Sequence, residues 1–176
     1  ASSTGQLFFS DCRVPKENLV GELHRGLPIF LEGLDEGRVM VSAFSIGGAQ
    51  GALERAVRYA KERFAFGKPI TAFQGVSFKI AEMAQKVEIA RCMCYNVAKL
   101  ADAGLPFSRE AAMCKLYATE MADEVCRDAI QILGANGISE EYDVERFYRD
   151  VKMMTIGEGT SEINKMVISR FVLDEY

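Results

Sequence analysis

The sequence predicts an all-α protein, an up-down antiparallel four-helix bundle with a short extended segment in front of it. The first observation is a stripe of apolar residues between positions 73 and 101 that alternates spacings of three and four, the pattern of a helix with one buried face. The second is that several such stretches follow one another with only short breaks containing Gly or Pro, as in helices that run up and down a bundle. We assign residues 29–176 to this bundle and residues 1–28 to the tail of a preceding β domain and its linker.

The composition is that of an ordinary globular protein and argues against several functions. Of the 176 residues, 49% are apolar and 26% are charged, which suffices for one domain with a sizeable core. The net charge of −4 offers no basic surface for nucleic acid or anionic lipid, and no apolar run of about 18 residues predicts a membrane span. The first residues, ASSTGQLFF, show neither an initiator Met nor signal-peptide features, so we expect the chain to be cut from a longer protein.

Cysteine and histidine usage argues against a metal centre. Five cysteines occur without any CxxC pair, and His24 is the one histidine, so we expect neither a zinc site nor a disulfide framework. Buried, reduced thiols are the remaining interpretation, and they are typical of a bacterial cytoplasmic protein or a mitochondrial matrix protein.

The front of the chain is predicted to be extended and the next stretch helical. Residues 6–14, QLFFSDCRV, are rich in aromatic and β-branched residues and stop at Pro15, which predicts one strand; residues 15–28 are predicted to form a loop. A helix is predicted over 29–62. Its glycines at 47, 48 and 51 each cost a helix about 1 kcal/mol, which indicates that another helix or a ligand lies close to them.

Three further helices complete the predicted bundle. The segment 72–103 carries the regular apolar stripe, and Ser108 is a good N-cap for a helix over 108–133 that stops at Gly134. After a short helix over 144–154, Thr160 is predicted to cap a last helix over 160–173. The positions expected to face inward in that last helix are Ile163, Met166, Val167 and Phe171.

The residues that could carry chemistry lie in three loops at helix ends: 63–70 (RFAFGKPI), 131–138 (QILGANGI) and 155–162 (TIGEGTSE). Taken singly, each loop can be explained as the end of a helix. Taken together, they offer the guanidinium of Arg63 and backbone N–H groups, which suit a phosphate. They also offer the carboxylate of Glu158 between Gly157 and Gly159, which suits a general base. The two glycines would let this backbone approach a ligand closely.

The order and spacing of these motifs resemble the C-terminal domain of the acyl-CoA dehydrogenase family. The matching segments are ERFAFGKPITAFQ at 62–74, EMAQKVEIAR at 82–91, QILGANGISEEYDVERFYRD at 131–150 and IGEGTSEI at 156–163. The resemblance covers nearly the whole chain, and residues 7–22 are similar to the last strand of the family's middle β domain and the following linker. It implies the α,β-dehydrogenation of an acyl-CoA thioester with FAD as hydride acceptor and Glu158 as the base that removes the α-proton.

The resemblance also implies roles for other residues. The positions that match contacts to FAD are Arg63, Gln74, Gln131, Gly134 and Ala135 of a neighbouring subunit and Thr160 and Glu162 of the subunit that holds the base. The positions that match the substrate site are Arg38, Gly159 and Arg170, and for the two arginines a solvated residue on a helix is the competing interpretation. The implied partners are an acyl-CoA, an electron-transfer flavoprotein as electron acceptor, and further copies of the chain in a dimer or tetramer.

The sequence departs from the family pattern at two positions and leaves three functions open. Ala135 replaces a frequent glycine and Gly157 a frequent tyrosine. Some members carry the base at the position of Gly37, so a glycine there together with Glu158 favours the common arrangement. An acyl-CoA oxidase or an enoyl-CoA reductase of the same fold would show the same motifs. A non-catalytic oligomerisation fragment is the third possibility, and the glutamate between two glycines argues against it.

Overall fold

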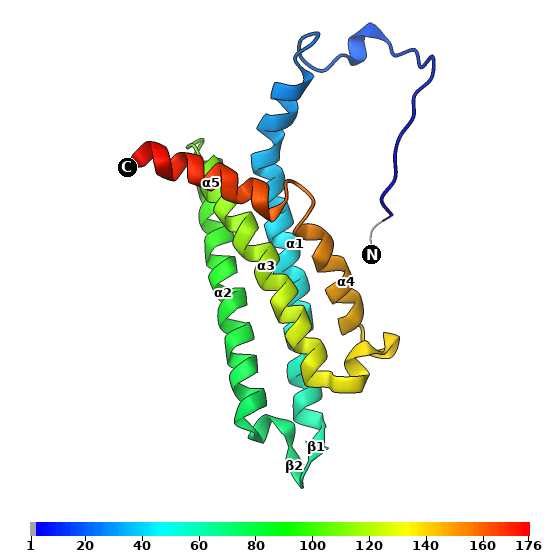
Figure 1. The fold of residues 1–176 in the computed structure, drawn as a ribbon, viewed down its shortest axis with the longest axis vertical. Helices are drawn as coiled ribbons and strands as arrows, with labels where there is room; N and C mark the ends of the chain where they lie inside the picture. The colour runs from blue at the N-terminus through cyan, green and yellow to red at the C-terminus, as the bar shows by residue number, and fades with distance from the viewer. Residues whose placement is uncertain (1–2) are drawn as a thin grey trace.

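The computed structural model describes residues 3–176 and is almost entirely helical, which confirms the all-α prediction (Figure 1). Three long helices run beside one another: α1 (Gly26–Glu62), α2 (Gln74–Asp102) and α3 (Ser108–Leu133). The shorter α4 (Val144–Met154) packs on α1 and α3, and α5 (Ser161–Glu175) runs across the bundle and packs mainly on α3 (Figure 1). Short 3₁₀ helices are η1 (Lys16–Asn18), η2 (Ile70–Ala72), η3 (Gly134–Ile138) and η4 (Glu140–Tyr142).

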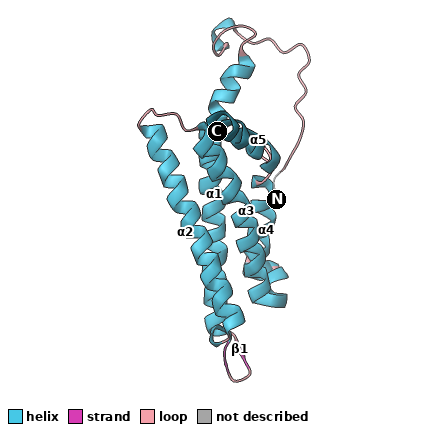
Figure 2. Cartoon of the chain, turned by 60° about the vertical axis from the view of Figure 1, so that its left-hand side comes forward, coloured by secondary structure: helices cyan, strands magenta, loops and turns pink. Residues whose placement is uncertain are grey.

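The predicted strand over residues 6–14 is wrong. These residues are extended but form no strand, and in two views they stand away from the bundle (Figures 1 and 2). Leu7, Phe8 and Phe9 are each more than three-quarters exposed. The physical reason is that a strand needs a partner for its backbone hydrogen bonds, and the described residues offer none there.

A small hairpin joins α1 to α2, where the sequence predicted only a break. Strands β1 (Phe64–Ala65) and β2 (Lys68–Pro69) pair antiparallel, with Phe64 opposite Pro69. The two turn residues, Phe66 and Gly67, have φ of 50° and 78°. Positive φ at both positions is the conformation of a tight two-residue hairpin.

The core lies between α1, α2 and α3. The stripe predicted on the second helix is confirmed, since Met83, Val87, Ala90, Cys94 and Val97 are buried. On α1 and α3 the most deeply buried apolar residues include a series of alanines: Ala49, Ala52, Ala56 and Ala60 on α1, and Ala111, Ala118, Ala122 and Ala129 on α3. These two helices pack on each other more extensively than any other pair.

Two of the three glycines singled out on α1, Gly48 and Gly51, are explained by a neighbouring helix, as predicted. A Cβ on Gly48 would lie 3.0 Å from the Val151 side chain, and one on Gly51 would lie 3.1 Å from the Phe147 ring. Both partners belong to α4, so these glycines let α4 approach α1. Gly47 has no neighbour within 4 Å of such a Cβ and does not take part.

The predicted helix ends are confirmed at Thr160 and Gly134 and wrong at Ser108. Thr160 Oγ1 accepts a hydrogen bond from the N–H of Ile163 at 3.3 Å, and Gly134 ends α3 with a φ of 61°. Ser108 is the first residue of α3 rather than its cap, and its hydroxyl donates to a carboxylate oxygen of Asp35 on α1. The serine therefore ties two helices together.

The predicted inward face of α5 is wrong for three of its four residues, since only Val167 is half-buried. Ile163, Met166 and Phe171 are 41–44% exposed, whereas Ser161 and Asn164 are buried. Because α5 runs across the bundle, its first turn makes the buried contacts and its apolar residues stay near the surface.

Buried thiols were predicted, and the structure confirms this for Cys94, Cys114 and Cys126, while Cys12 and Cys92 are exposed. Burial raises the pKa of Cys114 to about 11 and that of Cys126 to about 12, so both stay protonated at neutral pH. Within residues 3–176, no helix combines the length and apolar character needed to cross a bilayer.

Candidate active site

The three predicted loops lie toward two different ends of the molecule. The hairpin and the loop that starts at Gly134 lie at one end, whereas the turn that holds Glu158 lies toward the other, between α4 and α5 (Figure 1). The candidate residues of one chain therefore lie in two separate groups.

The Glu158 turn is a tight loop with an unusual backbone. The N–H of Ser161 donates to the carbonyl of Thr155 at 3.1 Å and closes the loop. Inside it, Glu158 and Gly159 have φ of 55° and 91°. A positive φ is uncommon for a residue with a side chain and often marks a functional position. Gly159 needs its glycine for this reason, whereas the backbone of Gly157 is not in the left-handed region.

The carboxylate of Glu158 lies directly over Gly37 of α1. A Cβ on Gly37 would be 2.7 Å from Oε2 and 3.1 Å from Cδ of Glu158. The missing side chain at position 37 therefore makes the space in which the carboxylate lies.

A buried lysine lies beneath the turn, and sequence reasoning missed it. Lys115 of α3 has no exposed surface, and its Nζ donates to the carbonyl oxygen of Gly159 at 2.6 Å. The signal was present in the sequence, because Lys115 lies three positions from both Ala112 and Ala118 on a face predicted to be buried. A lone lysine in such a face must find a polar partner, since a buried ammonium without one is costly.

A second buried side chain binds the same carbonyl. Asn164 of α5 is fully buried, and its Nδ2 donates to the carbonyl oxygens of Gly159 and Thr160, both at 2.9 Å. The sequence analysis did not name Asn164 among the inward residues of this helix. Two helices thus each direct a donor at one oxygen of the turn.

The charges around Lys115 come from several elements. Burial, and to a lesser extent the nearby Arg38 guanidinium, lower the pKa of Lys115 to about 8, while the carboxylates of Glu158, Glu120 and Glu162 oppose the shift. The ammonium form therefore predominates at neutral pH and falls away above about pH 8.

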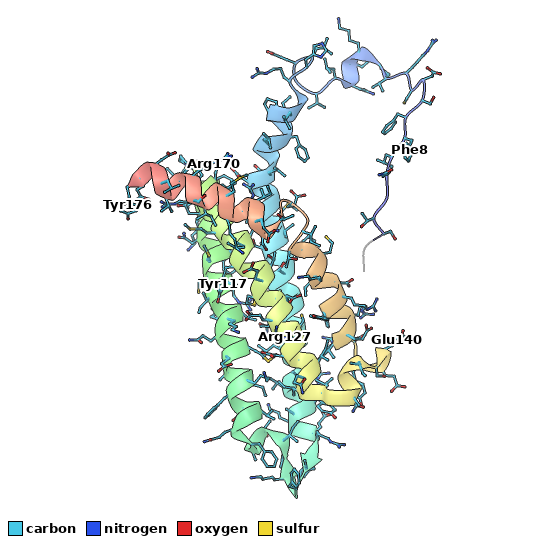
Figure 3. All side chains as sticks on the ribbon, in the orientation of Figure 1. Phe8, Tyr117, Arg127, Glu140, Arg170 and Tyr176 are labelled. Atoms are coloured by element: carbon cyan, nitrogen blue, oxygen red, sulfur yellow. The ribbon has the colours of Figure 1, made fainter. Side chains whose placement is uncertain are left out.

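Arg38 is buried, so its interpretation as a solvated helix arginine is wrong. Its Nη1 lies 2.6 Å from Oδ1 of Asp35, and its side chain is 7% exposed. Among the described residues its Nε has no hydrogen-bond partner. Arg170, the other predicted substrate contact, is exposed on α5 (Figure 3).

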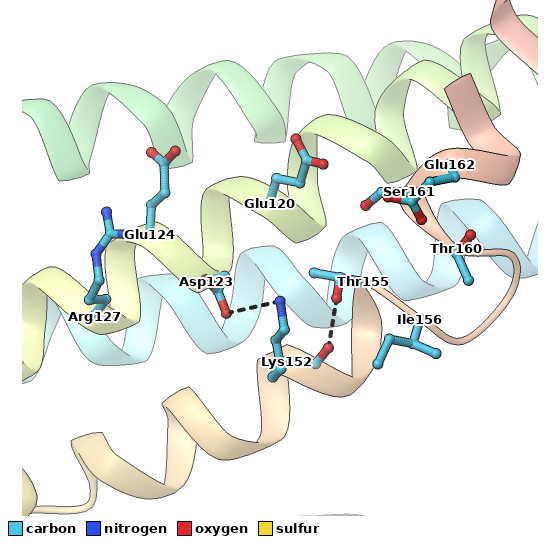
Figure 4. A pocket seen from close by; sticks show the side chains of 10 residues that line it. All are labelled: Glu120, Asp123, Glu124, Arg127, Lys152, Thr155, Ile156, Thr160, Ser161 and Glu162. Atoms are coloured by element: carbon cyan, nitrogen blue, oxygen red, sulfur yellow. Dashed lines mark hydrogen bonds and ion pairs between the residues drawn. The ribbon is translucent and has the colours of Figure 1, made fainter. Parts of the chain in front are cut away.

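A hollow of about 540 Å³ lies beside the turn, between α3, α4 and the start of α5 (Figure 4). Thr160 and Glu162, both predicted to contact the flavin, line it. The Glu162 N–H and the Thr160 hydroxyl hold the pKa of the Glu162 carboxyl below its usual range. The charged residues of the lining are Glu120, Asp123, Glu124, Arg127, Lys152 and Glu162. With more carboxylates than cations, this hollow suits hydroxyl groups better than phosphates.

The opposite end holds a hollow of about 340 Å³ that brings together Arg63, Gly134 and Ala135. Its other lining residues are Tyr59, Ile70, Ile132, Leu133 and Asn136, so the lining contains a cation and no carboxylate. This composition suits an anion such as a pyrophosphate. Gln74 and Gln131, predicted to act with Arg63, are exposed and lie outside this lining.

Comparison with known proteins identifies close relatives. The chain matches the family model "Acyl-CoA dehydrogenase, C-terminal domain" over residues 24–173. It is 48% identical over 172 residues to the probable acyl-CoA dehydrogenase YngJ of Bacillus subtilis, which covers 98% of this chain and 45% of that protein. It is 47% identical over 171 residues to the caffeyl-CoA reductase-Etf complex subunit CarC of Acetobacterium woodii, which covers 97% of this chain and 45% of that protein.

A solved structure has the same fold. Butyryl-CoA dehydrogenase from Megasphaera elsdenii is 44% identical and superposes with a TM-score of 0.91, over 94% of this chain and 43% of that one. The chain therefore spans less than half the length of the relatives that it matches.

Proposed function

Because the chain belongs to the acyl-CoA dehydrogenase family, we propose that it is the C-terminal part of a FAD-dependent enzyme that converts an acyl-CoA thioester into its α,β-unsaturated product. The observation that carries the proposal is the Glu158 turn. It holds a carboxylate over a glycine of α1, on a backbone strained into the left-handed region. Strain of this kind persists only where the surroundings enforce it, and it gathers at active sites.

In the proposed reaction, Glu158 takes the α-proton of the thioester. The α-proton is a very weak acid, so the negative charge that develops on the thioester oxygen must be stabilised at the same time. The N–H of Glu158 is suited to this task, because among the described residues none accepts a hydrogen bond from it. Carboxylate and N–H of one residue thus act on one thioester. FAD, when bound, supplies the acceptor for the hydride that leaves the β-carbon.

The separation of the two groups of candidate residues supports an assembly of at least two chains. Gly37 lies under the base, and Arg63 follows it by 26 positions, directly after the last residue of α1. At 1.5 Å per residue, the two positions are about 39 Å apart along the helix. One cofactor molecule cannot reach from the base to the Arg63 hollow of the same chain. We therefore assign Arg63, Gln74, Gln131, Gly134 and Ala135 to the FAD of a neighbouring subunit in a homodimer or homotetramer, and Thr160 and Glu162 to the chain's own.

The electron acceptor and a second candidate function follow from one relative. CarC is named as a subunit of a reductase–Etf complex. This supports an electron-transfer flavoprotein as the partner that reoxidises the proposed enzyme. CarC is also named as part of a caffeyl-CoA reductase. The reverse reaction, reduction of an enoyl-CoA, is therefore the second candidate function. In that direction Glu158 would deliver the proton to the α-carbon. Initial rates of the full-length enzyme, measured for acyl-CoA oxidation with the oxidised flavoprotein partner and for enoyl-CoA reduction with the reduced partner, distinguish the two directions.

The test of the proposed base is Glu158→Gln in the full-length enzyme that carries this chain. The amide keeps the size of the side chain and the backbone N–H, so acyl-CoA still binds, but it takes no proton at neutral pH. We expect anaerobic, single-turnover flavin reduction by a good acyl-CoA substrate to slow by about 10²–10⁴-fold. Glu36→Gln, next to Gly37 but exposed, is the matched control and should leave the rate unchanged. A Glu158→Gln enzyme that reduces its flavin within a few-fold of the wild-type rate would remove Glu158 from this role.

A further inference from the structure

A buried lysine whose partner is a backbone carbonyl needs an explanation. Lysine is almost never fully buried unless it is paired. Lys115 is fully buried, and among the described residues no ion pair is recorded for it; its contact is the carbonyl oxygen of Gly159. A residue with this desolvation cost is seldom kept for stability alone, because apolar replacements of buried charges are often as stable or more stable.

The bound carbonyl belongs to the residue that follows Glu158. Its oxygen accepts from Lys115 of α3 at 2.6 Å and from Asn164 of α5 at 2.9 Å. Both donors are fully buried, so solvent cannot take their place. Lys115 and Asn164 thus fix the peptide group between Gly159 and Thr160. This peptide group directly follows Glu158 and Gly159, the two residues with positive φ. If this peptide turned, Glu158 would turn with it.

We propose that Lys115 and Asn164 are positioning residues: their hydrogen bonds to the Gly159 carbonyl fix the carboxylate of Glu158 over Gly37. The inference rests on the proposed role of Glu158 as the base. Lys115 does not touch substrate or cofactor; it acts through the turn. The charged groups that face it are Arg38 on α1, Glu120 on its own helix, Glu158 in the turn and Glu162 on α5.

The test is Lys115→Met in the full-length enzyme. Methionine keeps most of the buried stem and removes the ammonium and its donors. We expect flavin reduction to slow by about 10–100-fold, because an error of about 1 Å in the placement of a reacting group can cost 10²-fold. The KM for acyl-CoA should change by less than about 3-fold, and the melting temperature should stay equal or rise. A residue that only supports the fold would give the opposite pattern, with lost stability and a largely unchanged rate per folded molecule.

Two further measurements keep the test independent of activity and of one variant. Hydrogen exchange of the peptide 155–162 should speed up in Lys115→Met, with exchange in α2 unchanged. Asn164→Ala removes the second donor and should show the same two effects to a smaller extent. Lys165→Met, an exposed lysine on α5, is the matched control and should change neither.

The outcomes separate the inference from the proposed function. Slow flavin reduction in Glu158→Gln together with wild-type reduction and wild-type exchange in Lys115→Met would overturn the inference and leave the function intact. Wild-type reduction in Glu158→Gln would overturn the function, and faster exchange in Lys115→Met would then show only that the lysine holds the turn. If neither Lys115→Met nor Asn164→Ala folds, the residues are structural and the positioning role is wrong.

Discussion

Gly37→Ala tests the geometry of the site with one added methyl group. The new Cβ would lie 2.7 Å from Oε2 of Glu158, whereas ordinary van der Waals contact begins at 3.4 Å. The carboxylate must therefore move by about 0.7 Å, the difference between these two distances. It is the end of a flexible side chain, so the fold can absorb the shift. Alanine also favours a helix over glycine by about 1 kcal/mol, so we expect no loss of stability.

The catalytic effect of Gly37→Ala should be large for so small a change. Since a 1 Å misplacement can cost 10²-fold, a shift of 0.7 Å predicts flavin reduction slower by on the order of 10–100-fold. The assay is anaerobic single-turnover reduction by acyl-CoA, with the melting temperature measured in parallel. Gly33→Ala is the control, one turn earlier on α1 with nothing within 4 Å of its Cβ. Equal rates for the two variants would refute the placement of the carboxylate over Gly37.

Two further predictions concern stability. Gly159→Ala places a side chain on a backbone with φ of 91° and should lower the free energy of unfolding by about 1–2 kcal/mol. Urea denaturation measures this loss. If Gly157→Ala loses as much stability, the left-handed conformation at Gly159 is wrong. The pKa of Lys115 is about 8 in the fold and about 10.4 in an unfolded chain. Between these values the unfolded chain binds the extra proton, so the free energy of unfolding relative to Lys115→Met should rise by about 2 kcal/mol from pH 7.5 to pH 10. Urea titrations of both proteins at pH 7.5 and pH 10 measure this rise, and a pH-independent difference would mean that Lys115 is not buried as a charged group.

Much of the fold follows from the period of the apolar residues. The stripe from Phe73 to Ala101 predicted α2 to within two residues, and α3 was predicted with its observed bounds. Periodicity reports that one side of a helix is apolar, but not what covers that side. For α5 it therefore predicted burial of Ile163 and Phe171, although the helix crosses the bundle and buries only its first turn.

The candidate site was predicted less completely than the fold, for physical reasons. Glu158 stood out because two glycines surround it. Lys115 and Asn164 did not, because their importance arises from a contact between α3, α5 and a turn that are far apart in sequence. The strand predicted for residues 6–14 failed for a related reason, since local composition cannot supply a hydrogen-bonding partner.

The alanine-rich contact between α1 and α3 limits how this protein can change. Alanine has no side-chain rotamers to lose on folding, so the two helices come together without freezing flexible side chains. The same contact has no room for a longer side chain. Ala52 and Ala122 are both fully buried, so a larger residue at either position must push the helices apart. Gly37 and Lys115 lie on these same two helices. A substitution deep in this contact can therefore change the distance between the Glu158 carboxylate over Gly37 and Lys115 without contacting either residue. Amino-acid substitutions should accordingly be rarer at the contact between α1 and α3 than at the exposed surface of α2.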